Sequence, residues 1–376
     1  MKKKLLTVLL VLSMLAAVLY GCAEPQQEVT EPTQIPALTE ITVSEAETQV
    51  HEKINFTDSS DRKIEVPSDI SRIAPSGSVA QMILLTLAPD LLVGLSSIPD
   101  EAQLAYLPKE AANLPEFGQF YGGKANLNME ALIAANPQII IDIGNRNNSI
   151  AEDMDMVQEQ TGIPTVFIDG ELSALPQAYR MLGKLLNRED DAEKLAAFIE
   201  NTLAMAVENS AKINESEKKS VFFGTGPTGL ECNAAGSAQA DAIELIGAVN
   251  AIETEEITNK NGGTVVNMEQ VYAVDPDVII LTPDGVFETM KTGEWASLTA
   301  VENGAYYEIP SLPYSWMCMP PSVNRVLGIW WLGKLIYPEV YDYDIVPIVQ
   351  EYYQLFWHYD LSDTEAEGFL AHSSLK

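Results

Sequence analysis

Short apolar runs alternate with amphipathic stretches through most of the chain. Residues 139–141 and Val278–Leu281 are unbroken apolar runs, typical of strands buried on both faces of a parallel sheet. Further strands are predicted at residues 91–95, 165–168, 220–223 and 306–309. Strands that alternate with helices in this way predict an α/β fold with mostly parallel sheets.

One pattern occurs twice in the chain, at residues 126–142 and again at residues 265–281. Each copy reads Asn-Met-Glu, then a short helical stretch, an Asn-Pro or Asp-Pro pair, and an apolar strand. The proline ends the helix because it pushes the preceding residue out of the α region. The interval between the two glutamates, Glu130 and Glu269, is the size of a domain, so the repeat predicts two Rossmann-like lobes.

The segment between the repeats contains no plausible strand. Apolar residues at positions 192, 195, 196, 199, 203 and 206 recur at helical spacing and predict a long helix over residues 190–212. Asn187, followed by Asp190, could cap its start. We therefore expect an N-terminal lobe over residues 51–174, linking helices over 175–212 and a C-terminal lobe over 213–376, with one long helix as a stiff hinge.

The start of the chain predicts its compartment. Three lysines are followed by an apolar run over residues 5–19, which has the length of an export-signal core. The run ends in Leu19-Tyr20-Gly21-Cys22, which resembles the lipobox of bacterial lipoproteins. We expect a signal peptide over residues 1–21, a lipidated Cys22 and a disordered tether to residue 50, with an uncleaved anchor as the alternative. Either reading predicts a protein on the outer face of the bacterial cytoplasmic membrane, held there by its anchor alone.

Charge and composition narrow the function. The 376 residues carry a formal net charge of −32, which argues against nucleic acid as a partner. The three histidines, His51, His358 and His372, lie near the chain ends, so a histidine-rich metal site or a His-activated nucleophile is not expected. We expect no enzyme activity, no resident cofactor and no structural metal. The glycine-rich residues 224–229 match a dinucleotide fingerprint only weakly, because Pro227 interrupts them.

Several segments resemble one family. Phe56-Thr-Asp-x-x-x-Arg62-x-Ile-x-Val-Pro67, Arg72-Ile-Ala-Pro-Ser76 and the two Asn-Met-Glu helices are similar to the substrate-binding lipoproteins of ABC importers for iron-siderophores, haem and cobalamin. The resemblance implies a monomer with two α/β lobes, one long connecting helix and a ligand cleft between the lobes. It also implies that Glu130 and Glu269 pair with arginines of a dimeric ABC permease. Two equivalent carboxylates would provide a two-point charge match to such a partner.

The cleft should be lined by loops at the carboxyl ends of the strands. Aromatic residues in these loops suit a large, flat ligand, polar ones could orient it, and Arg325 could hold a carboxylate or oxyanion in a forked geometry. The predicted ligand contacts are Ser76, Tyr121, Asn145, Arg146, Tyr314, Trp316 and Arg325.

The function that we expect is capture of an iron chelate or a similar metal complex, such as a siderophore, haem or a corrinoid, for delivery to an ABC permease. A molybdate- or tungstate-binding protein of an ABC importer is the alternative within transport. A surface α/β enzyme, or an adhesion or sensor lipoprotein, is the alternative from another class. Cys232 and Cys318 fall on predicted loops of the C-terminal lobe, where they could form a disulfide or remain buried thiols.

Overall fold

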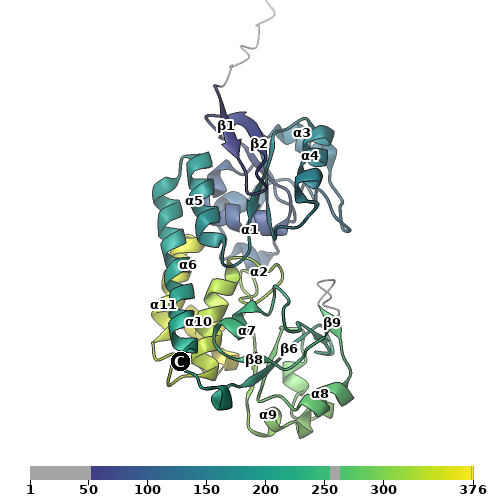
Figure 1. Ribbon diagram of the computed structural model, residues 1–376, viewed down its shortest axis with the longest axis vertical. Coiled ribbons are helices and arrows are strands. Elements are labelled where there is room, and N and C mark those ends of the chain that lie inside the picture. The colour runs from purple at the N-terminus through teal and green to yellow at the C-terminus, as the bar shows by residue number, and fades with distance from the viewer. Residues whose placement is uncertain (1–51, 255–262, 374, 376) are drawn as a thin grey trace, which may run out of the picture. The chain divides into compact units, whose positions relative to one another are not determined.

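The computed structural model describes residues 52–254, 263–373 and 375 (Figure 1). The predicted signal peptide, Cys22 and the predicted tether lie outside the described residues. In the part of the chain that is described, no helix combines the length and apolar character needed to cross a bilayer.

The N-terminal sheet follows a hairpin. Strands β1 (Lys53–Thr57) and β2 (Lys63–Pro67) pair antiparallel, so the segment 56–67 that resembles the family belongs to a β-hairpin. The side chain of Asp58 closes the turn by accepting hydrogen bonds from the backbone amides of Ser60 and Arg62. Three parallel strands follow in the order β3 (Ile73–Pro75), β4 (Ile139–Gly144) and β5 (Thr165–Asp169).

The prediction of a strand at residues 91–95 is wrong. Pro89–Leu91 form a 3-10 turn (η1), and the residues after it make only two isolated bridges, Ile73 with Leu92 and Leu95 with Glu116. Pro89 lacks an amide hydrogen and favours the turn, so too few residues remain for a ladder. The helices around this sheet are α1 (Ser78–Leu87), α2 (Glu101–Leu104), η2 (Lys109–Asn113), α3 (Met129–Ala135) and α4 (Ile150–Thr161).

Two packed helices follow β5. They are α5 (Leu175–Leu186) and α6 (Glu189–Ser210), so the predicted long helix is confirmed to within two residues at each end. The predicted capping role of Asn187 is wrong. Asn187 has a left-handed backbone, φ 55°, and ends α5, while Arg188 precedes α6 without a side-chain cap. The connection is too short for a separate capping residue, and asparagine tolerates the left-handed conformation that a helix end needs.

The C-terminal sheet has its strands in the order β11-β10-β6-β7-β9, with β8 beside β6. Pairing is parallel among β6, β8, β10 and β11, whereas β7 runs antiparallel to β6 and β9. The strands are β6 (Ser220–Thr225), β7 (Glu231–Cys232), β8 (Val249–Asn250), β9 (Thr264–Val265), β10 (Val278–Leu281) and β11 (Tyr306–Glu308). The helices with them are η3 (Glu215–Glu217), α7 (Asp241–Leu245), α8 (Met268–Val274), η4 (Phe287–Thr289), η5 (Glu294–Ser297), α9 (Thr299–Glu302) and α10 (Asn324–Ile336).

The sequence repeat is a structural repeat. Asn128 caps α3 and Asn267 caps α8, each accepting a hydrogen bond from the backbone amide three residues later. Both helices end at a residue with positive φ, Asn136 and Asp275, directly before a proline. A parallel strand buried on both faces follows in each case, β4 and β10.

The C-terminal helices contact elements from both ends of the chain. They are α11 (Ile345–Phe356), α12 (Asp363–Phe369) and η6 (Ala371–Ser373). Helix α11 packs on α10 and also contacts α6 and α1 (Figure 1). His358 Nε2 lies 3.0 Å from the carbonyl oxygen of Thr86 in α1, and the Tyr353 hydroxyl donates to the carbonyl of Leu312. One hydrophobic cluster, which we call the main core, runs from β3 through α6 and β6 to α12.

Candidate ligand-binding cleft

A cavity of about 580 Å³ lies where α6 meets loops that follow strands of the N-terminal sheet and the region of α7. This volume is in the range typical of small-molecule sites. We call it the Arg325 cavity, and its lining residues are Asn145, Glu171, Leu172, Ser173, Leu203, Gly236, Ala238, Asp241, Glu244, Leu245 and Arg325. Asn145 follows β4 and Glu171 follows β5, as expected for a site at the carboxyl ends of parallel strands.

Arg325 is the most buried charged group of this cavity, with 1% of its surface exposed. Its Nη1 donates to Asp241 Oδ2 at 2.6 Å and to the carbonyl oxygen of Ala238 at 2.6 Å, while Nε donates to the carbonyl of Ser322 at 3.2 Å. Its Nη2 has no hydrogen-bond partner among the described residues. Nη1 and Nε are thus held by the protein, whereas Nη2 is a buried donor that no described residue pairs.

Burial shifts both members of this ion pair. Desolvation lowers the pKa of Arg325, and the nearby Asp241 opposes that shift. Desolvation likewise raises the pKa of Asp241, with Arg325 acting in the opposite direction. The carboxylates of Glu244 and Glu171 raise the pKa of Asp241 further, so these negative groups lie close enough to interact. Arg325 and Asp241 therefore largely neutralise each other, and Glu171 and Glu244 add uncompensated charge.

A second polar cluster lies under the carboxyl end of β4. Asp142 accepts hydrogen bonds from the hydroxyl of Ser76 and, at 2.8 Å, from the hydroxyl of Tyr121. Burial raises the pKa of Asp142 to about 6, although both hydrogen bonds act to lower it. Burial next to Asp142 also raises the pKa of Tyr121. Sequence analysis missed Asp142, and the available signal was an acidic residue inside an otherwise apolar strand.

The structure brings together two of the seven predicted ligand contacts, Asn145 and Arg325, in one cavity. Ser76 and Tyr121 form a separate pair through Asp142. Arg146 is half exposed, and its side chain pairs with Asp61 at 3.0 Å. Glu171, Asp241 and Glu244, which also line the Arg325 cavity, were not predicted.

The other two predicted aromatic contacts, Trp316 and Tyr314, pack against aromatic residues. Trp316 is 2% exposed and lies in the main core, with its Nε1 donating to the Tyr353 hydroxyl at 3.4 Å. Tyr314 is partly buried, with its ring 5.5 Å from that of Trp357. Neither ring lines the Arg325 cavity. Their roles as ligand contacts stay predictions.

The two glutamates of the repeat are exposed in the first turns of α3 and α8. Each is followed three residues later by a large exposed apolar side chain. Ile133 is 66% exposed after Glu130, and Tyr272 is 41% exposed after Glu269. Residues three apart on a helix are neighbours, so α3 and α8 present the same combination of one carboxylate and one apolar group.

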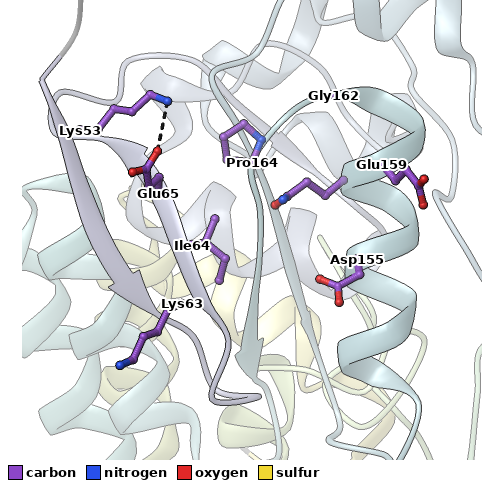
Figure 2. Close-up of a pocket in the computed structure, with 9 residues that line it drawn as sticks. Lys53, Lys63, Ile64, Glu65, Asp155, Glu159, Gly162 and Pro164 are labelled. Carbon is purple, nitrogen blue, oxygen red and sulfur yellow. Dashed lines mark hydrogen bonds and ion pairs between the residues drawn. The ribbon is translucent and has the colours of Figure 1, made fainter.

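A further groove, of about 650 Å³, lies between the β1–β2 hairpin and α4 (Figure 2). Its charged residues have both signs: Lys53 and Lys63 from the hairpin, with Glu65, Asp155 and Glu159. Lys53 already pairs with Glu65 at 3.3 Å, as Figure 2 shows. None of the predicted ligand contacts lines this groove.

The cysteines and the possible metal ligands form neither a disulfide nor a metal site among the described residues. Cys232 and Cys318 are buried free thiols rather than a disulfide, and burial raises the pKa of both. The described residues contain no group of three or more His, Cys, Asp or Glu side chains arranged to hold a metal ion.

This α/β arrangement, with two parallel-containing sheets, a linking helix pair and a cavity at the carboxyl ends of strands, is that of an extracytoplasmic solute-binding protein. Residues 108–313 match the model of the periplasmic binding protein family, and the chain belongs to that family. Members of this family bind solutes for ABC transporters.

Three comparisons illustrate the relationship. The high-affinity haem uptake system protein IsdE of Staphylococcus aureus strain MRSA252 is 22% identical over 246 residues, which are 63% of this chain and 80% of IsdE. An ABC transporter solute-binding protein from Sulfurospirillum deleyianum has a TM-score of 0.77 and 28% identity, covering 84% of this chain and 99% of its own. The molybdate-binding protein MolA of Haemophilus influenzae, solved with molybdate, has a TM-score of 0.66 and 19% identity over 82% and 99% of the two chains.

Proposed function

We propose that this protein captures an iron chelate, or a similar large metal complex, and delivers it to an ABC permease. The observation that carries the proposal is the Arg325 cavity, at the carboxyl ends of β4 and β5 in a periplasmic binding protein fold. Ligand bound there would contact the proposed N-terminal lobe through Asn145 and Glu171, and the proposed C-terminal lobe through Arg325. The relationship to the haem uptake protein IsdE supports a metal complex as ligand.

An oxyanion such as molybdate or tungstate is the second candidate. The fold similarity to the molybdate-binding protein MolA favours it. The cavity of about 580 Å³ is, however, far larger than a tetrahedral oxyanion, which is usually held by a tight set of backbone amides and cations. We therefore place the metal complex first.

The permease would dock on α3 and α8. Glu130 and Glu269 are exposed at equivalent places in the structural repeat, so they suit a partner with two equivalent basic sites. Ile133 and Tyr272 would add apolar contact beside each ion pair. We further propose that Cys22 carries the lipid anchor and that residues 22–50 tether the two lobes to the membrane.

A binding titration tests the capture function. Tryptophan fluorescence is followed while the protein is titrated with haemin, ferric siderophores, cobalamin, molybdate and tungstate. We expect saturable one-to-one binding of one metal complex, which Leu203→Trp abolishes by filling the cavity from α6. Val207→Trp is the matched control, since Val207 lies on the same helix, is 60% exposed and does not line the cavity. Binding of an oxyanion alone would replace the proposal with its alternative, and binding of none would refute it.

A further inference from the structure

We propose that the Arg325 cavity prefers a positively charged metal complex over a neutral or anionic one, and that Glu171 and Glu244 impose this preference. The inference rests on the proposed function and names the chemical class of its ligand. It is carried by the charges that line the cavity and by one unpartnered buried donor.

The cavity lining holds three carboxylates and one cation. The carboxylates are those of Glu171, Asp241 and Glu244, and the cation is Arg325. No lysine or histidine lines the cavity. Asp241 already pairs with Arg325 at 2.6 Å, and Glu171 also acts on the pKa of Arg325, so this single cation faces three carboxylates. Glu171 and Glu244 are both exposed side chains and stay hydrated in the ligand-free cavity. A ligand that enters thus meets a local field of negative sign.

The two carboxylates outside the ion pair come from different parts of the fold. Glu171 lies in the loop between β5 and α5, while Glu244 lies in α7 and accepts from the amide of Gly236 at 3.4 Å. The loop after β5 and the α7 region thus each contribute one carboxylate to the lining. An anionic ligand would bring like charges together, which destabilises a complex, whereas a cationic group would find a partner in either carboxylate.

Arg325 does not reverse this preference. Its charge is balanced by Asp241, and its side chain is held by the carbonyls of Ala238 and Ser322. What it still offers is the Nη2 donor, which is buried and has no partner among the described residues. A buried donor of this kind favours a ligand with an acceptor at that point, because leaving the donor unpaired is costly. A carbonyl or hydroxamate oxygen satisfies it without adding charge.

The experiment compares ligands that differ in charge but share one metal-binding group. The probes are a ferric trihydroxamate with a pendant ammonium, its neutral N-acetyl derivative and its anionic N-succinyl derivative. Cationic aquocobalamin, neutral cyanocobalamin, anionic haemin and an anionic ferric tricatecholate complete the panel. Affinities for the full-length protein are measured by equilibrium dialysis at low and at physiological salt. The variants are Glu171→Gln, Glu244→Gln and their combination, and Glu110→Gln, on the exposed part of η2, is the control.

In the ligand series that binds, we expect the cationic member to bind about tenfold more tightly at low salt than its neutral or anionic counterpart. A tenfold ratio of affinities corresponds to roughly 1.4 kcal/mol. The double variant should reduce this ratio to about one, and Glu110→Gln should leave it unchanged. Tightest binding of haemin or of the tricatecholate, or a charge ratio that the double variant does not alter, would overturn the inference and leave the capture function intact. Failure of every metal complex to bind would refute the proposed function itself.

Discussion

The buried carboxyl of Asp142 should make the stability of this protein depend on pH. Asp142 is 4% exposed, and burial raises its pKa from an ordinary value of 3.8 to about 6. The folded state therefore binds this proton more tightly than the unfolded state does. The contribution of Asp142 to the free energy of unfolding should fall as pH rises from about 4 to about 6, and its whole penalty should be present above that range. Ionised Asp142 is thus a destabilising group at neutral pH.

The substitution Asp142→Asn isolates this contribution. An amide is never charged, and its oxygen can still accept from Ser76 while its nitrogen donates to the Tyr121 oxygen. A pKa difference of about two units corresponds to about 3 kcal/mol. The stability of the variant relative to the native protein should therefore increase by about 3 kcal/mol between pH 4 and pH 7.

Urea denaturation of both proteins across this pH range measures the effect. Taking the difference between the two proteins cancels the many other carboxylates, which titrate in both. Asp360→Asn, at an exposed carboxyl, is the control and should give a nearly constant difference. A constant difference for Asp142→Asn as well would refute the reasoning, because the buried carboxyl would then titrate alike in the folded and unfolded states.

Three other substitutions test the packing and the docking surface. Tyr353→Ala removes a fully buried ring that lies 5.3 Å from Phe369, and should lower the free energy of unfolding in urea by about 3–5 kcal/mol. A loss below about 1 kcal/mol would show that the C-terminal helices do not brace the fold. Gly328→Ala places a Cβ 2.2 Å from the Trp316 carbonyl oxygen, so it should lower the free energy of unfolding by about 1–3 kcal/mol. The temperature of half-unfolding should fall accordingly, and an unchanged temperature would contradict this. The double variant Glu130→Ala, Glu269→Ala should bind ligand normally but fail to stimulate the permease ATPase, and normal stimulation would exclude these glutamates from docking.

Much of the fold could be predicted because its strands are buried on both faces. The predicted strand over Val278–Leu281 matches β10 at both ends, and the other predicted strands except that at residues 91–95 lie on β4, β5, β6 and β11. The long helix α6 could be predicted because its buried residues recur at helical spacing. The repeated Asn-Met-Glu motif was informative because its asparagine caps a helix in both copies.

The rest depended on contacts that sequence spacing does not encode. Asn187 carries a side chain suited to either helix end, and the tight α5–α6 connection decides between them. Trp316 packs against Phe369 of α12 and donates to Tyr353 of α11, contacts that its position in a loop did not predict. The Arg325 cavity is lined by Glu171, Asp241 and Glu244. Glu171 is far from the other two in the chain, so only the fold brings the three carboxylates together.

Uptake of a radiolabelled metal complex tests the central claim most directly. Cells that lack this protein are compared with cells that carry it, and each receives the metal complex that the purified protein binds. Capture and delivery to a permease predict that accumulation inside the cell requires the protein and is lost with Leu203→Trp but not with Val207→Trp. Equal accumulation with and without the protein, for every complex that it binds, would contradict the account.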